Sequence, residues 1–226
     1  MFRIPYLSLG IDGTHVRFEE APRRIPEDRH NKQHYRNRKN FDSINLMAIC
    51  NDKRFCFIDS RWPGSTHDSR VWTMSSAKPV IEEQHDFLLV GDSAYAISET
   101  LTKPFSEAEI QSELDGARRR RKVLFNTRLC GARTVMTENI FGSWKRRWPI
   151  VKNMRHHMSM AQKAIKATVI LENICREWKE ELPDDEEEDD EDDPLQVEGM
   201  PDHGGGGGTV LTRGKAKRLQ LLDAME

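Results

Sequence analysis

The feature that most limits the fold of this 226-residue chain is an acidic run followed by a glycine run near its C-terminus. Pro183 precedes ten consecutive acidic residues at 184–193, and five glycines follow at 204–208. Such segments bury too little apolar surface to offset the entropy lost on ordering, and glycine runs act as flexible linkers. We therefore expect one folded domain over residues 1–182, a disordered acidic and glycine-rich linker over 183–208, and a short helix or tail over 209–226.

The formal net charge of −2 hides an uneven distribution. Residues 1–182 hold 31 basic and 23 acidic side chains, whereas residues 183–226 hold 4 basic and 14 acidic ones. A basic domain with an acidic tail indicates a polyanionic partner for the domain. No apolar run approaches the roughly 18 residues that span a bilayer, so we expect no membrane partner. The four cysteines have neither zinc-knuckle nor disulfide-scaffold spacing, which favours a reducing compartment.

Hydrophobic patterning predicts a mixed α/β domain. Strands are expected over 6–18, 43–50, 54–60 and 87–90, the second and third forming a hairpin and the fourth lying buried in the sheet. A short helix is expected from His67 to Ser76, capped by Ser65 or Thr66. Longer helices are expected over 131–148 and 158–179, while 118–122 reads only as a basic segment. In the last helix, residues spaced by three and four predict one apolar face: Ala161, Ile165, Thr168, Leu171 and Cys175.

Three carboxylates lie at positions that are hard to explain as surface charge. Asp12 lies inside an apolar strand, Asp92 closes the strand at 87–90, and Glu138 lies within a helix. A single buried acid is more often a helix cap or an ion-pair partner, and that interpretation stays open for each of them. Three acids at one point would repel one another unless cations joined them, and paired Mg²⁺ or Mn²⁺ ions suit oxygen ligands. Such pairs catalyse in-line displacement at phosphorus.

Five ordered motifs give these acids a common context. They are GIDGTHV at 10–16, HYRNRKNFDSINLMAIC at 34–50, WPGSTHDSRVW at 62–72, GDSAY at 91–95 and TENIFGSWKRRWP at 137–149. Over residues 8–178 the chain resembles the nuclease domain of PIF/Harbinger transposases and Harbinger transposase-derived nucleases. The resemblance implies an RNase H-like α/β fold, a mixed sheet flanked by helices. It also implies a DDE triad of Asp12, Asp92 and Glu138 that binds two divalent cations, Mg²⁺ or Mn²⁺, and cleaves or transfers DNA strands.

Other motif residues have two interpretations each. His67 and Asp68 could contact metal or DNA, although Asp68 could equally complement the dipole of a first helical turn. Basic residues near the triad could clamp phosphates, or could simply be solvated. The predicted DNA-binding set is Arg36, Arg38, Lys39, Arg118, Arg119, Arg120, Arg121, Lys145, Arg146 and Arg147. Trp144 and Trp148 are expected in the core rather than stacked on bases.

Two functions stay open at this point. The first is a metal-dependent DNA endonuclease or transposase, which we expect in the nucleus because 118–122 also reads as a nuclear-import signal. The resemblance further implies a separate Myb-like protein for DNA targeting, and an oligomer is possible. The second is a domesticated, non-catalytic adaptor that binds DNA or chromatin and retains the nuclease fold.

Overall fold

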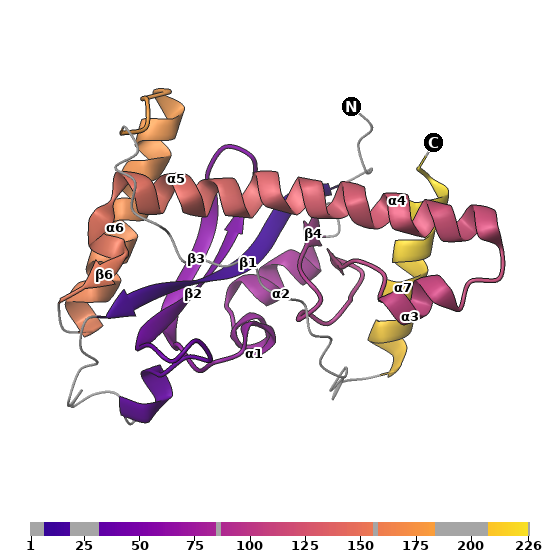
Figure 1. The fold of residues 1–226 in the computed structure, drawn as a ribbon, viewed down its shortest axis with the longest axis horizontal. Coiled ribbons are helices and arrows are strands. Elements are labelled where there is room, and N and C mark those ends of the chain that lie inside the picture. The colour runs from indigo at the N-terminus through magenta and orange to yellow at the C-terminus, as the bar shows by residue number, and fades with distance from the viewer. Residues whose placement is uncertain (1–6, 19–31, 85–86, 156–157, 184–207, 226) are drawn as a thin grey trace.

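The computed structural model describes residues 7–18, 32–84, 87–155, 158–183 and 208–225. Its centre is a mixed six-stranded sheet (Figure 1). Five strands follow the order β3-β2-β1-β4-β5, and β6 pairs with the far end of β1. The strands are β1 (Leu7–Phe18), β2 (Ser43–Cys50), β3 (Phe55–Pro63), β4 (Leu88–Val90), β5 (Leu101–Thr102) and β6 (Asn153–Met154). The first three are antiparallel, whereas β4 and β6 run parallel to β1 and β5 runs parallel to β4.

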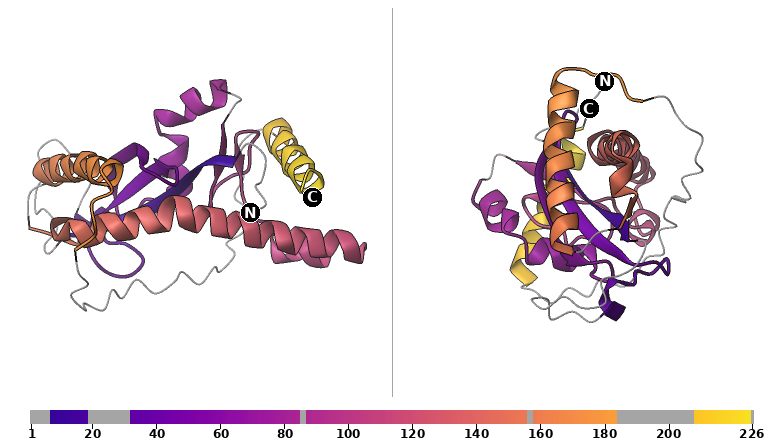
Figure 2. Two further views of the ribbon diagram at one scale, coloured as in Figure 1. Left: turned by 90° about the horizontal axis from the view of Figure 1, so that it is seen from above. Right: turned by 90° about the vertical axis from the view of Figure 1, so that its left-hand side faces the viewer.

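Helices cover both faces of this sheet. A long helical rod crosses one face, and α1 and α2 lie on the other (Figure 2, left). The rod consists of α4 (Gly116–Arg133), a π-helical turn η2 (Thr134–Glu138) and α5 (Asn139–Arg147). The remaining helices are α1 (Asp68–Thr73), α2 (Ala77–Glu83), α3 (Glu107–Gln111), α6 (Met158–Glu177) and α7 (Gly208–Asp223), with short 3-10 turns η1 (Lys32–Tyr35) and η3 (Pro149–Val151).

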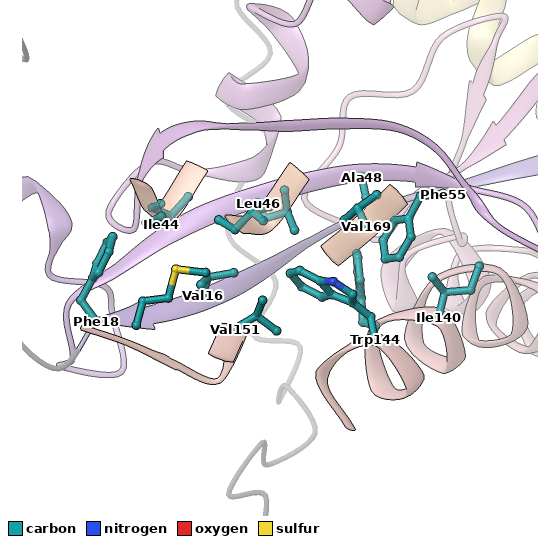
Figure 3. Packing of buried hydrophobic residues seen from close by; sticks show 14 of the residues in the cluster. Val16, Phe18, Ile44, Leu46, Ala48, Phe55, Ile140, Trp144, Val151 and Val169 are labelled. Atoms are coloured by element: carbon teal, nitrogen blue, oxygen red, sulfur yellow. The ribbon is translucent and has the colours of Figure 1, made fainter. Parts of the chain in front are cut away.

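The alternation of side chains along the strands divides the core into two layers. On β2, Leu46 and Ala48 face the rod and α6, whereas Met47 and Ile49 face α1 and α2. Figure 3 shows the first layer, where Trp144 of α5 packs beside Phe55 with ring centroids 5.9 Å apart. Because both faces are covered, every residue of β2 is buried.

A third cluster lies at the far end of the rod. Leu88 and Val90 of β4 pack there with Phe125 and Leu129 of α4 and with the end of α7. In α7, Leu222 is fully buried. The last predicted segment is therefore a helix that packs on the domain. The division of the chain at 183 and 208 stays a prediction, since residues 184–207, including the expected disordered linker, lie outside the described residues.

The structure confirms the RNase H-like α/β fold that the resemblance implied, with its mixed sheet flanked by helices. Trp144 is fully buried, as expected for a core residue. Within the described part of the chain, none of the helices is long and apolar enough to cross a membrane.

Three local expectations were wrong. The rod begins at Gly116 rather than 131, because Asp115 caps it by accepting a hydrogen bond from the Ala117 N–H. The cap of α1 is His67, whose side chain accepts from the Ser69 N–H, rather than Ser65 or Thr66. On α6, Leu171 is 43% exposed, because Val169 and Glu172 occupy the buried face instead.

Candidate active site

The acids gather where β1 is paired on one side only. Strand β4 pairs with β1 as far as Gly10 opposite Val90, and β6 pairs with it again only from Arg17. Between these points β1 pairs with β2 alone among the described strands. Asp12 lies within this stretch, so on one side of it no described strand pairs with the backbone of β1.

Asp12 is held against the underside of the rod. Its Oδ1 accepts the backbone N–H of Gly13 at 2.9 Å. Gly10, on the same face two residues earlier, brings the strand very close to η2: a Cβ there would lie 2.7 Å from the Thr137 methyl carbon. Only glycine permits this approach, which leaves Asp12 9% exposed and Thr137 Oγ1 3.4 Å from its Oδ2.

Asp92 reaches the same point from the neighbouring strand. It follows Val90 by two residues, as Asp12 follows Gly10, and Gly10 and Val90 are paired in the parallel register. Asp92 lies past the end of β4, where parallel sheets place their ligand sites, and its charge acts to raise the pKa of Asp12, so the two acids lie near one another. Asp92 Oδ1 accepts the Ala94 N–H at 2.9 Å, which fixes the carboxylate in the turn after the strand.

Glu138 joins the site through Arg133. The guanidinium of Arg133 donates to Asp12 Oδ2 and to Glu138 Oε1, each at 2.7 Å. Arg133 and Glu138 both belong to the rod and lie five positions apart across the π-helical turn. Such turns frequently mark functional sites. The Glu138 carboxylate is 46% exposed, whereas that of Asp12 is 13% exposed.

A fourth acid, Asp68, lies on the other side of β1. A Cβ on Gly13 would lie 2.5 Å from Asp68 Oδ1, so the carboxylate rests directly on the strand backbone. Asn45 of β2 donates to the same oxygen at 2.6 Å and to the Thr66 carbonyl at 2.8 Å. Asp68 is thus held in place by a buried side chain as well as being in the first turn of α1.

Electrostatic repulsion within this group is incompletely relieved. Burial raises the pKa of Asp12 to about 7; the Arg133 guanidinium opposes this shift, while Asp92 and Asp68 add to it. Burial also raises the pKa of Asp68, with the Asn45 hydrogen bond opposing and Asp92 adding. Protons or bound cations would relieve the cost of burying the Asp12 and Asp68 carboxylates together.

The donor set suits a hard divalent cation, which prefers carboxylate oxygens. In the arrangement described here, however, no three His, Cys, Asp or Glu side chains among the described residues are grouped closely enough to hold one ion. Arg133 instead bridges two of the acids. Asp12, Asp92 and Glu138 thus have the right chemistry for a metal, with a guanidinium currently acting as their counter-ion.

Among the predicted basic residues of the loop before β2, an interaction with these acids is seen for Arg38. Arg38 is exposed, and its charge acts to lower the pKa of Asp68, so it stands close to the acids. Lys39 is exposed too. Arg36 is about half exposed and donates to Asn40 Oδ1 at 2.8 Å.

The basic residues at 118–121 are at the other end of the rod, and most are used within the fold. Arg121 donates to the backbone carbonyl of Leu222 at 2.7 Å. Arg119 donates to the carbonyl of Glu113 at 2.8 Å, and Arg118 lies 3.7 Å from the Glu113 carboxylate. Arg120 is exposed.

The cluster after Glu138 is divided in the same way. Lys145 and Arg146 are partly exposed. The guanidinium of Arg147 is only 10% exposed and pairs with the fully buried Glu172 at 3.1 Å. Its placement in the α5–α6 interface, rather than on an open surface, indicates a structural role. The side chain of His67 caps α1 and interacts with Ser69. No hydrogen bond between His67 and an acid is seen among the described residues.

Sequence reasoning missed the residues that organise the acids. Arg133 was not predicted as a site residue, and Asn45 appeared only within the motif and the strand at 43–50. The signal for Asn45 was present, because it is the one polar residue of the run INLMAIC at 44–50, and the structure shows it to be 3% exposed. A buried amide needs partners, and Asp68 supplies one.

Comparison with known proteins agrees with this geometry. No curated protein and no solved structure matches the chain. The sequence profile of the DDE superfamily endonuclease family matches residues 11–173, which include Asp12, Asp92 and Glu138. With most of its length matched to that profile and its acids on the expected elements, the chain belongs to the DDE superfamily endonucleases.

Proposed function

We propose that the chain is a divalent-metal-dependent DNA endonuclease of the transposase type, with Asp12, Asp92 and Glu138 as its metal-binding acids. One observation carries the proposal: Asp12 on β1 lies close enough to Asp92, just past the end of the adjacent parallel strand β4, for their charges to interact, and Arg133 links Asp12 to Glu138 on the rod above. Two Mg²⁺ or Mn²⁺ ions would supply an activated water or hydroxyl and stabilisation of the leaving oxygen.

The residues around the triad have separate tasks in this proposal. Asn45 positions Asp68, which adds negative charge beside Asp12 and Asp92 without joining the triad. Arg38 and Lys39 contact DNA phosphates next to the acids, and Arg120, Lys145 and Arg146 extend the contacts along the rod. These contacts orient the phosphodiester bond but carry no sequence information, so a separate Myb-like protein provides targeting.

The finer family assignment also belongs to this proposal. The five motifs support membership of the PIF/Harbinger group, and the RRRRK segment at 118–122 supports a nuclear location. Arg119 and Arg121 both donate to backbone carbonyls, so Arg120, which is exposed, is the residue of that segment most available to a partner.

Nicking of supercoiled plasmid in Mn²⁺ tests the catalytic proposal. Asp92→Asn is close to isosteric and retains an oxygen for the Ala94 N–H, so the fold should persist while nicking falls at least about a hundredfold. Glu138→Gln should have the same effect. Glu83→Gln, an exposed acid at the end of α2, is the matched control and should cut like the wild type. Equal cutting by the wild type and the Asp92 variant would refute the proposal.

A non-catalytic DNA or chromatin adaptor is the second candidate. The ion pairs of Arg133 with Asp12 and Glu138 favour it, since a permanent guanidinium counter-ion would occupy the metal ligands. An adaptor would bind DNA equally well with and without Mn²⁺ and would leave the plasmid intact in every variant.

A further inference from the structure

Helix α6 has two apolar faces, although a helix on the surface of a domain normally has one. The inner face packs on the sheet and α5 through Ala161, Ile165 and Val169. The outer face carries Met160, Ile170, Leu171 and Ile174, and Trp178 follows directly after the helix; these large apolar side chains are 36–71% exposed. Contiguous exposed apolar surface of this kind marks an interaction site.

The outer residues follow a seven-residue repeat. Met160, the exposed Ala167 and Ile174 are seven apart, and Leu171 and Trp178 are seven apart beside them. Ile170 lies three positions after Ala167 and four before Ile174, which is the alternation of three and four residues at which helices pack against one another. The stripe therefore has the pattern of a surface that packs against another helix.

No described element of this chain covers the stripe. The exposed fractions of Ile170 and Trp178 are 60% and 71%. In the right panel of Figure 2, α6 is the element nearest the viewer, with no other ribbon helix or strand in front of it. The occupant must therefore come from outside the described residues.

Charges flanking the stripe indicate what the occupant is. Lys163 and Glu177 are both exposed, and each lies seven residues from Ile170, in opposite directions. Seven residues correspond to about 10.5 Å along a helix. If two copies of α6 cross antiparallel at Ile170, each Lys163 faces the Glu177 of the other copy, so the stripe is complementary to itself. Parallel pairing would instead place Lys163 against Lys163.

We propose that α6 is a homodimerisation surface, on which a second copy of this chain packs its own α6 antiparallel with Ile170 at the two-fold axis. The contact is isologous, as expected for a symmetric dimer, and contains two equivalent Lys163–Glu177 pairs. Because one helix pair buries less surface than a standard permanent interface, the dimer exchanges with monomer and depends on protein concentration. The proposal does not depend on catalytic activity.

Analytical ultracentrifugation of the full chain over low to high micromolar concentrations tests this inference. The wild type should change from monomer to dimer, and Ile170→Glu should remain monomeric. Val80→Glu is the matched control, since Val80 is 52% exposed on α2, far from the stripe in sequence and fold, and should dimerise like the wild type.

A charge exchange tests the antiparallel register. Lys163→Glu and Glu177→Lys should each weaken dimerisation about tenfold, since each variant converts two attractive pairs into repulsive ones. The double variant should restore the wild-type dissociation constant. Since both positions are exposed, thermal melts at a protein concentration where the wild type is monomeric should stay unchanged in all three variants. A wild type that stays monomeric throughout, or a double variant no better than the single ones, would overturn the proposal.

Discussion

At the scale of single residues, Arg133 determines how the acids can be used. Its guanidinium lies 2.7 Å from oxygens of both Asp12 and Glu138. A divalent cation bound at the proposed triad would need the same oxygens, so guanidinium and metal would compete for them. Under the proposed function, Arg133 would be the counter-ion of the metal-free site, and cation binding would release it.

Replacement of Arg133 tests this competition. Arg133→Ala removes a positive charge beside the acids, so Mn²⁺ should bind about three- to tenfold more tightly by isothermal titration calorimetry. The metal-free variant should also melt at a lower temperature, since Asp12 and Glu138 lose their partner. Arg120→Ala, an exposed position on the same rod, should alter neither property. Unchanged or weaker Mn²⁺ binding by Arg133→Ala would contradict the competition.

The titration of Asp12 gives a second prediction at this scale. Its folded-state pKa of about 7 lies above the usual value of 3.8, so the folded state holds the proton more tightly than the unfolded state. The resulting stabilisation is fully present below pH 3.8 and is lost as pH rises through 7. Without metal, the stability of the wild type relative to Asp12→Asn should fall by about 2–3 kcal/mol between pH 5 and pH 8.

Chemical denaturation at several pH values in a chelator measures that difference. Mn²⁺ binds the deprotonated carboxylate, so it should stabilise the wild type more at pH 8 than at pH 6. A stability difference between wild type and Asp12→Asn that does not change with pH would show that Asp12 titrates normally.

At the scale of elements, the four longer strands and the second half of the rod could be predicted from sequence, whereas β5, β6 and the first half of the rod could not. The run SINLMAIC at 43–50 is apolar, β-rich and bounded by turn residues, so its strand was evident. In α4, the four arginines at 118–121 hid a helical stripe that includes Phe125 and Leu129. Local composition gave the wrong start because the apolar partners of that stripe come from several separate segments, from Leu88 of β4 to Leu222 of α7.

The same limit applies to the site. Asp12, Asp92 and Glu138 could be selected because each interrupts an apolar segment or stands in a recognisable motif. The bridge made by Arg133 could not, because it depends on how far the rod lies above β1. That distance is set by the contact of Gly10 with Thr137, a property of packing rather than of spacing.

The α5–α6 interface offers a stability test at the element scale. Glu172 of α6 is fully buried and accepts from Ser143 Oγ at 2.9 Å and from Arg147 Nε at 3.1 Å. Glu172→Ala would remove the closest carboxylate from the buried Arg147 guanidinium and an acceptor from Ser143 Oγ, so the free energy of unfolding should fall by about 3–5 kcal/mol in urea denaturation.

Glu180 is the matched control, because it pairs with the same arginine at 4.0 Å while 50% exposed. Glu180→Ala should cost less than about 1 kcal/mol, as surface ion pairs do. Equal losses for the two variants would mean that burial of Glu172 is not what makes its pair important.

At the scale of the whole molecule, charge is segregated along the chain. The domain up to residue 182 carries an excess of eight positive charges, whereas the ten consecutive acids at 184–193 carry ten negative ones. The acidic run at 184–193 is joined directly to Pro183. Because it belongs to the same chain, its local concentration near the basic side chains of residues 1–182 is high. It should therefore compete with DNA for the same basic side chains.

Neutralising residues 184–193 to Asn and Gln changes the formal charge of the chain from −2 to +8. Binding to duplex DNA, followed by fluorescence anisotropy, should tighten about tenfold at low salt, and the gain should shrink as salt screens the competition. A control that exchanges Asp for Glu and Glu for Asp keeps the charge and should bind like the wild type. Since the acidic segment and DNA compete only through charge, an affinity gain that persists undiminished at high salt would exclude electrostatic shielding as its cause.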